Sequence, residues 1–274
     1  MAMRPFHIPE PAPSVTDDPE AQLQARARAR SKALIGGSIE KRRANGTAST
    51  LTGNYLLDPI FRPEDEARLQ AYCDPADPRP LVIEIGFQLG VFASAFCLQN
   101  PHVRFLGFEV RKKFCEDADA RLQALGVTNA LLALVDAREM LPRVAPPASI
   151  DELFVFFPDP WWKSRHIKKR LISADFLADA ALRIKLGGRL LLKTDVLDYS
   201  TWAEAEMRNE PAFRTTRLQD PSAGLPHTLR ERRCHFHKIP THAVESRRVP
   251  CSDAYLDSSH PHLAPDAAAE KKAD

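Results

Sequence analysis

Short apolar runs alternate with amphipathic stretches through the middle of the chain. Runs rich in Val, Ile, Leu and Phe predict five buried strands, at 81–85, 103–108, 130–135, 150–157 and 189–193. Helices are expected between them, at 91–99, 111–125, from Ser173 to the Gly187-Gly188 pair, and 198–209, with another beginning at Pro63. This regular alternation predicts an α/β fold with a doubly wound, mostly parallel sheet.

Acidic residues recur where these strands are predicted to end. They are Glu84, Glu109, Asp136, Asp159 and Asp195, each at or within two residues of a strand C-terminus. A single acid there is more often a helix cap or a first-turn residue. Five of them along one edge of a parallel sheet are harder to explain by capping. We expect them to line one crevice, where open α/β sheets bind their ligands.

A glycine loop follows the first predicted strand and indicates a nucleotide-containing cofactor. Its sequence is Gly86-Phe-Gln-Leu-Gly90, which lacks the G-x-G-x-x-G spacing of dinucleotide-binding proteins. Glu109 suits the two ribose hydroxyls that dinucleotides and S-adenosylmethionine share. Glu84, inside the first strand, suits a cationic methionine group better than a pyrophosphate. The pattern therefore favours S-adenosylmethionine and disfavours a Rossmann dehydrogenase.

The stretch 153–171 joins an apolar strand to a cationic, aromatic segment. The strand ends in Pro158-Asp159-Pro160, and Trp161 and Trp162 follow. The basic residues after them are Lys163, Arg165, His166, Lys168, Lys169 and Arg170. A run of charge alone is usually a solvated helix start. Beside Asp159 and two tryptophans, we interpret it as a surface that binds RNA phosphates, with one tryptophan stacking on a base and the other packing.

Composition narrows the class of protein without identifying it. The net charge is only +2, so clustered rather than global charge argues for nucleic acid. The five cysteines include no C-x-x-C pair, which favours reduced thiols in a cytoplasmic protein over disulfides or zinc. Neither a signal peptide nor a membrane span is apparent. Cys234, His235 and His237 fit a surface strand better than a metal site.

Several of these segments together resemble one family. They are Glu84-Ile-Gly-Phe-x-x-Gly90, Gly107-Phe-Glu109, the Pro-Asp-Pro-Trp segment with its basic continuation, and Thr194-Asp195. These are similar to the bacterial tRNA (guanine-N7)-methyltransferases over roughly residues 81–231. The resemblance implies a Rossmann-like class I methyltransferase fold. It also implies transfer of a methyl group from S-adenosylmethionine to N7 of a guanine in the variable loop of tRNA.

The resemblance also implies roles for individual residues. It gives cofactor-binding roles to Glu84, Gly86, Gly90, Glu109, Asp136 and Asp159. Asp159 is in addition the expected catalytic residue. It gives substrate-binding roles to Lys163, Asp195, Thr228 and Glu231. Phosphate binding by Arg165, Lys168, Lys169 and Arg170 is our interpretation of the basic run and not of the resemblance. Guanine N7 carries a free lone pair, so catalysis needs positioning rather than a general base.

Two departures from the family pattern shape the alternatives. Gln88 stands where the family usually has glycine, and the sequence after Glu231 differs from the usual ending. A non-catalytic RNA-binding protein on a methyltransferase scaffold, its cofactor site weakened by Gln88, is therefore the alternative hypothesis. We expect a flexible arm at 1–50, whose basic cluster either orders on RNA or stays solvated, a methyltransferase domain at 51–249, and a disordered tail at 250–274. The oligomeric state, monomer or homodimer, stays open.

Overall fold

The computed structural model describes residues 42–44 and 55–251. Most of the predicted arm, including Arg26, Arg28, Arg30 and Lys32, lies outside the described residues, as does the tail beyond residue 251. Within the arm, Arg43 donates to Glu66 at 2.8 Å and Arg42 pairs with Glu139. The end of the basic cluster therefore contacts the domain in this structure.

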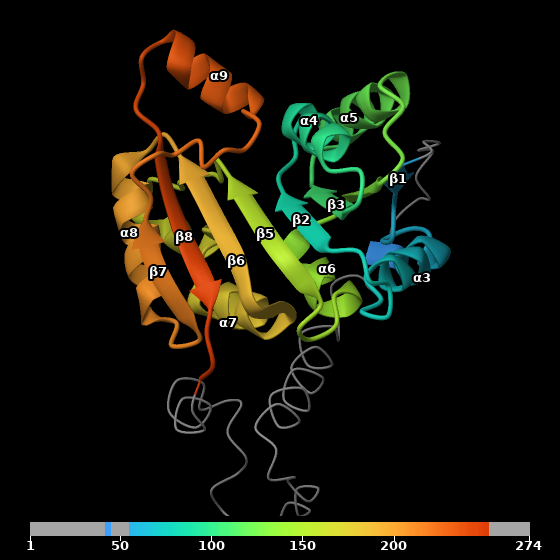
Figure 1. The fold of residues 1–274 in the computed structure, drawn as a ribbon, viewed down its shortest axis with the longest axis horizontal. Coiled ribbons are helices and arrows are strands. Elements are labelled where there is room, and N and C mark those ends of the chain that lie inside the picture. Colours follow the sequence, from blue (N-terminus) through green and yellow to red (C-terminus); the bar gives the residue numbers. More distant parts are fainter. Residues whose placement is uncertain (1–41, 45–54, 252–274) are drawn as a thin grey trace, which may run out of the picture.

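A single mixed sheet organises the described residues (Figure 1). Its strands, in spatial order, are β1 (Leu56–Leu57), β4 (Ala130–Leu134), β3 (Arg104–Glu109), β2 (Leu81–Ile85), β5 (Ile150–Phe156), β6 (Ile184–Thr194), β8 (His242–Arg248) and β7 (Phe213–Arg217). Neighbours from β1 to β6 run parallel, and β8 is antiparallel to both β6 and β7. The strand order reverses between β2 and β5, which is where doubly wound sheets bind ligands.

Helices cover both faces of the sheet, as the predicted fold class requires. They are α3 (Pro63–Tyr72), α4 (Val91–Gln99), α5 (Lys112–Ala124), α6 (Ala137–Val144), α7 (Ala174–Arg183), α8 (Leu197–Asn209) and α9 (Leu229–Phe236), with a 3-10 turn η1 (Ser164–Lys169). Apolar side chains of α4 and α5 form one core with the sheet, and those of α3, α6, α7 and α8 form the other. The doubly wound, mostly parallel sheet is confirmed.

The bounds of the first four predicted strands agree closely with those observed, but the fifth strand begins five residues earlier than predicted and two local expectations are wrong. The helix that Ser173 caps ends at Arg183, before the Gly187-Gly188 pair, and β6 runs through both glycines. A side chain at Gly188 would lie 2.8 Å from the Asp151 carbonyl oxygen of the adjacent strand, so close backbone packing explains this glycine. Cys234, His235 and His237, expected on a surface strand, lie in α9 and at its C-terminal cap.

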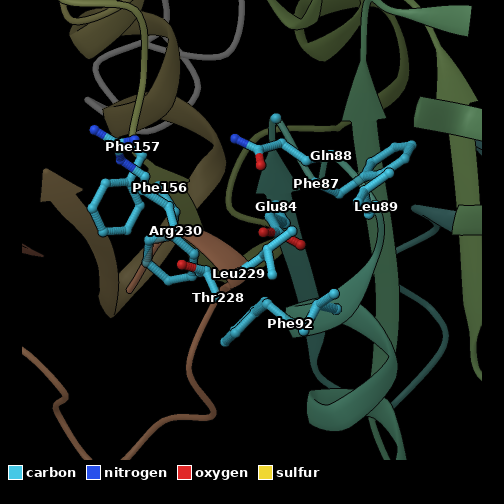
Figure 2. Close-up of a pocket in the computed structure, with 12 residues that line it drawn as sticks. Glu84, Phe87, Gln88, Leu89, Phe92, Phe156, Phe157, Thr228, Leu229 and Arg230 are labelled. Atoms are coloured by element: carbon cyan, nitrogen blue, oxygen red, sulfur yellow. The ribbon is translucent and has the colours of Figure 1, made fainter. Parts of the chain in front are cut away.

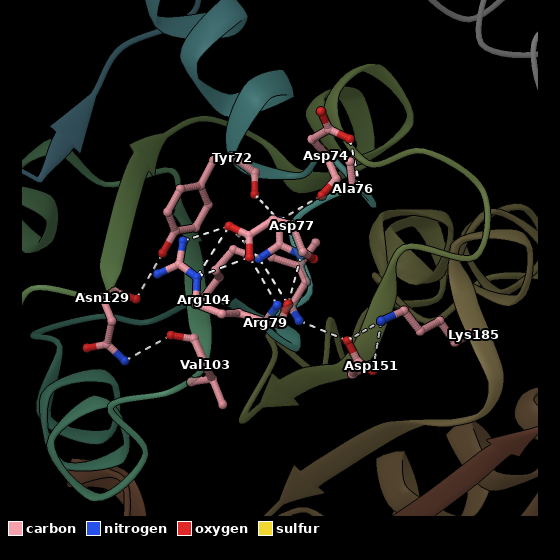
Figure 3. Close-up of polar contacts among 11 residues, drawn as sticks. Tyr72, Asp74, Ala76, Asp77, Arg79, Val103, Arg104, Asn129, Asp151 and Lys185 are labelled. Carbon is pink, nitrogen blue, oxygen red and sulfur yellow. Dashed lines mark hydrogen bonds and ion pairs between the residues drawn. The ribbon is translucent and has the colours of Figure 1, made fainter.

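We call the end of the sheet where β2 to β6 finish the carboxyl edge, and the opposite end the amino edge. At the amino edge, Arg104 is 1% exposed and begins β3 (Figure 3). Its guanidinium donates to the carbonyl oxygens of Tyr72, Asp74, Asp77 and Arg79 at 2.7–3.2 Å. This buried cation therefore joins the loop after α3 to the sheet. No helix in the described part of the chain is both long and apolar enough to span a membrane.

Candidate active site

A cleft of about 490 Å³ opens at the carboxyl edge, where the strand order reverses. The ends of β2, β3, β4 and β5 supply its walls, and Glu109, Asp136 and Asp159 line it. The structure thus brings three of the five predicted acids into one cavity. Trp161 and Lys169, from the cationic aromatic segment, line the same cleft.

Glu109, the last residue of β3, is held firmly in the cleft wall. Its carboxylate accepts hydrogen bonds from the backbone N–H groups of Gln88 at 3.2 Å, Val110 at 2.9 Å and Arg111 at 3.1 Å. The Arg111 Nε–H group also donates to Oε1 at 3.4 Å, whereas Oε2 accepts only from Gln88 among the described residues, so Oε2 keeps a lone pair for a ligand hydroxyl. The acid is fixed before any ligand arrives.

The glycine loop reaches Glu109 through an unusual backbone. Gly86 and Gly90 have φ of 84° and 66°, and Gln88 between them has φ of 48°. A side chain at Gly90 would lie 2.9 Å from the Ala118 Cβ atom, so this glycine is needed for packing as well as for conformation. Gln88 adopts the left-handed region at a cost of about 1–2 kcal/mol. Its N–H group donates to Glu109, which partly offsets that cost.

A second, smaller cavity of about 20 Å³ lies beside the cleft (Figure 2). Glu84, Gln88, Phe157, Thr228 and Arg230 are among the side chains that line it. Gln88 and Phe157 also line the main cleft, so they stand between the two cavities. The five acids therefore do not share one crevice, contrary to our expectation. Glu84 belongs to the smaller cavity.

Glu84 is a buried carboxyl group with one oxygen, Oε2, that has no hydrogen-bond partner among the described residues. Burial raises the pKa of Glu84 to about 8, and the carboxylates of Glu109 and Glu231 add to the rise. Removal from water disfavours the charged form, and neighbouring negative charges do the same. Glu84 is therefore mostly protonated at neutral pH in this state of the protein.

Asp136 and Asp159 differ in how much of their carboxylate is already used. Asp136 caps α6 and accepts hydrogen bonds from the N–H group of Arg138 at 3.0 Å and from its guanidinium at 2.6 and 3.1 Å. Burial opposes ionisation, but these contacts outweigh it and lower the pKa of Asp136. Asp159 is exposed, in the loop after β5, and no described residue donates a hydrogen bond to its carboxylate.

The basic segment after Asp159 divides into an anchor and an outward surface. Arg170 is half-buried: it donates to the Pro160 carbonyl oxygen at 2.8 Å, and its guanidinium lies 4.5 Å from the Trp202 ring centroid. It thus holds the loop in place. Lys163, Arg165, Lys168 and Lys169 are exposed, and Lys169 lies 5.0 Å from the Trp161 ring centroid. Of the two tryptophans, Trp161 packs in the loop, while Trp162 is 65% exposed.

The Thr228–Glu231 motif fixes α9 to the end of β6. The Thr228 hydroxyl accepts from the Glu231 N–H group at 3.0 Å, and the Glu231 carboxylate accepts from the Thr228 N–H group at 2.7 Å. This reciprocal pair is a capping box. The buried Lys193 ammonium donates to the same carboxylate at 2.8 Å. Asp195 lines neither cavity and forms an ion pair with Arg230.

Comparison with known proteins decides the family. Residues 78–240, more than half of the chain, match a family model described as "Putative methyltransferase". The chain belongs to this methyltransferase family. It is 38% identical over 172 residues to a tRNA (guanine-N(7)-)-methyltransferase of Deinococcus radiodurans, covering 62% of this chain and 52% of that protein.

A Myxococcus xanthus protein of the same name is 38% identical over 119 residues, covering 43% of this chain and 58% of that protein. The matches therefore span only about half to three-fifths of the length of these relatives. Among solved structures, a 16S rRNA methyltransferase is 20% identical, covers 69% of this chain and 95% of that chain, and gives a TM-score of 0.49.

The candidate site contains residues that our reasoning from sequence missed. Arg138 engages Asp136, and Arg230 engages Asp195. The first contact is local and follows a helix-capping pattern that the sequence displays. The second joins residues far apart in the chain, and nothing in the pattern signals it. Among the described residues, no three His, Cys, Asp or Glu side chains gather as a metal site.

Proposed function

We propose that this protein transfers a methyl group from S-adenosylmethionine to N7 of a guanine in the variable loop of tRNA. The observation that carries the proposal is the cleft at the carboxyl edge. Ordered acids on β3 and at the start of α6 lie on one side, and an exposed, unpaired Asp159 lies beside a cationic loop on the other. The names of the relatives support the same reaction.

The residues present fit S-adenosylmethionine. Glu109, fixed by three backbone N–H groups, would bind the ribose hydroxyls. Asp136 would offer its remaining lone pairs to a further polar edge of the nucleoside. Glu84, buried with a partnerless oxygen, would meet the cationic methionine end. When bound, the cofactor supplies a methyl group on a positively charged sulfur.

Asp159 would orient the guanine. Its free carboxylate can accept hydrogen bonds from the N1–H and amino groups of the base, which turns N7 in a defined direction. N7 is unprotonated at neutral pH, so no residue needs to remove a proton. As the purine gains positive charge, the nearby carboxylate stabilises it. Positioning and electrostatics are thus the contributions of the protein.

The contacts of Gln88 do not favour the alternative of a non-catalytic scaffold. Its N–H group donates a hydrogen bond to Glu109, and its side chain lines both cavities; Figure 2 shows it at the smaller one. The Gln88→Gly variant tests this directly. A lower KM for S-adenosylmethionine in the variant than in the wild type would show that the Gln88 side chain crowds the cofactor.

The deciding experiment incubates the full chain with methyl-labelled S-adenosylmethionine and unmodified tRNA. Digestion of the tRNA should release labelled 7-methylguanosine. A tRNA transcript whose variable-loop guanine is replaced by adenine is the matched control and should stay unlabelled. Binding of tRNA by the wild type without any methylation would overturn the enzymatic proposal, and methylation restored by Gln88→Gly would then assign the loss to Gln88.

We also propose that this protein acts in the cytoplasm, where a tRNA substrate would be found. The cysteines fit that proposal: all five are free thiols, four of them buried. Free thiols persist in a reducing compartment.

A further inference from the structure

Helix α9 carries an outer face that the proposed reaction does not use. Glu231 and Cys234 are buried against the domain, whereas Arg232, Arg233 and Phe236 are exposed. Phe236 is 82% exposed, more than any other large apolar side chain in the described ranges. On a helix surface, residues three or four apart are neighbours, so both arginines flank the phenylalanine.

The cations of this face have no partner within the described residues. Arg232, Arg233 and Lys238 form neither an ion pair nor a side-chain hydrogen bond there. The neighbouring Arg230, by contrast, pairs with Asp195. An exposed aromatic ring among unpaired cations is complementary to a polyanion with exposed bases.

Contacts at both ends of α9 fix this outer face beside the candidate active site. The capping box and the buried Lys193–Glu231 pair hold the start of α9, and the Ile239 N–H group donates to the Cys234 carbonyl oxygen at 2.8 Å at its end. Thr228 and Arg230 line the cavity that contains Glu84. Figure 1 shows α9 at the carboxyl edge, the end toward which the arrows of β5 and β6 point.

We propose that Arg232, Arg233, Phe236 and Lys238 form a second contact for the RNA substrate, here called the α9 face. The cations bind backbone phosphates, and the Phe236 ring stacks on an unpaired base. Stacking on aromatic side chains is how proteins hold single-stranded and loop nucleotides. One exposed aromatic side chain surrounded by cations suits RNA better than a protein partner, because a protein interface needs a broader apolar patch. The inference rests on the proposed RNA substrate.

The test measures the affinity of the full chain for unmodified tRNA across a range of salt concentrations. Phe236→Ala should weaken binding about tenfold with an unchanged salt slope, because stacking releases no counterions. Phe236→Trp should restore affinity. The Arg232→Ala/Arg233→Ala double variant should weaken binding and reduce the salt slope by about 1.5. In methylation, these variants should raise KM and leave kcat unchanged.

Arg214 provides the matched control, because it is exposed on β7 and has no ion-pair partner in the described part of the chain. It pairs in register with Arg247, which lies opposite Arg189, and Arg189 pairs with Glu152 near the start of β5, so Arg214 lies toward the amino edge. Arg214→Ala should bind tRNA like the wild type. If Arg214→Ala lost as much affinity for tRNA as the double variant, net charge alone would explain the effect, and the proposal would be overturned.

The outcomes separate this inference from the proposed function. Wild-type affinity in both α9 variants, with methylation intact, would overturn the α9 face alone. A wild-type protein that neither binds nor methylates tRNA would overturn both. A self-association that Phe236→Ala abolishes, with tRNA affinity unchanged, would assign the face to a second copy of the chain and contradict RNA contact.

Discussion

Two sets of cations, one at each edge of the sheet, use positive charge in opposite ways. At the amino edge, Arg104 is buried and each of its contacts is a carbonyl oxygen or a carboxylate of the domain, while Lys185 pairs with Asp151 at 2.8 Å (Figure 3). At the carboxyl edge, Lys163, Lys168 and Arg232 are exposed and form no ion pair with any described residue.

The difference separates charges that stabilise the fold from charges available to a ligand. A buried cation without its partners would cost several kcal/mol, so Arg104 cannot leave its carbonyl partners to bind a ligand. An exposed cation costs nothing to leave in water and gains when it meets a phosphate. The acids of the site show the same contrast, because Glu231 forms an ion pair with Lys193 whereas Asp159 has no ion-pair partner among the described residues.

The largest expected effect is on the amino edge. Arg104→Ala leaves the carbonyl oxygens of Tyr72, Asp74 and Arg79 without their donor, and unsatisfied buried groups cost about 1–3 kcal/mol each. We expect the free energy of unfolding in urea to fall by roughly 5 kcal/mol. The activity per folded molecule should stay unchanged. A mild loss of stability would show that water replaces the guanidinium.

Asp159→Ala should have the reverse effect at the carboxyl edge. We expect turnover to fall about 100-fold or more, the usual consequence of removing one transition-state contact. Thermal denaturation should be nearly unchanged, because Asp159 is exposed and has no hydrogen-bond donor among the described residues. Asp159→Asn, which keeps one acceptor oxygen, should retain more turnover. A folded alanine variant with full activity would remove Asp159 from the mechanism.

Glu84 gives the site a pH dependence of known sign. Its pKa is about 8 in the folded protein, against 4.5 for an ordinary glutamate. Between these values the folded state keeps a proton that the unfolded chain has released, so stability falls as the pH rises through that window. The Glu84→Gln variant should lose this slope, and at pH 8 its free energy of unfolding should exceed that of the wild type by on the order of 4 kcal/mol. Denaturation midpoints at pH 5 and pH 8 check this, and parallel profiles would contradict it.

The smallest expected effect compares one lysine from each edge. Lys168→Ala should weaken tRNA binding a few-fold and reduce the salt slope by about 1, because one phosphate contact is lost. Lys185→Ala, which removes a lysine already paired with Asp151, should leave both quantities unchanged. Equal effects of the two variants would mean that the edges do not differ in their availability to RNA.

The strands of the central sheet could be predicted from sequence because their signals are local. The apolar run that became β2 lies between Pro80 and Gly86, and its predicted bounds are those observed. Strand β7 escaped prediction because Phe-Arg-Thr-Thr-Arg contains a single apolar residue. Helix α9 was misread because its capping box, a local signal, was interpreted only as a substrate motif.

The site could be predicted as a list of acids but not as a geometry. Glu109, Asp136 and Asp159 follow from their places at strand ends, which topology brings to one edge. The separation of Glu84 and Asp195 from that cleft depends on α9, which folds back from much later in the chain. Such long-range packing leaves no periodic trace in the sequence.

The wall that Gln88 forms between the two cavities has a consequence for selective inhibition. A compound that fills the larger cavity and extends a cationic group past the Gln88 amide toward Glu84 would depend on the shape of this side chain. Proteins with glycine at the corresponding position offer that compound no amide to contact. Because the resemblance predicts glycine at this position in the family, Gln88 supplies a chemical group that such a compound could contact in this chain and not in a protein with glycine there.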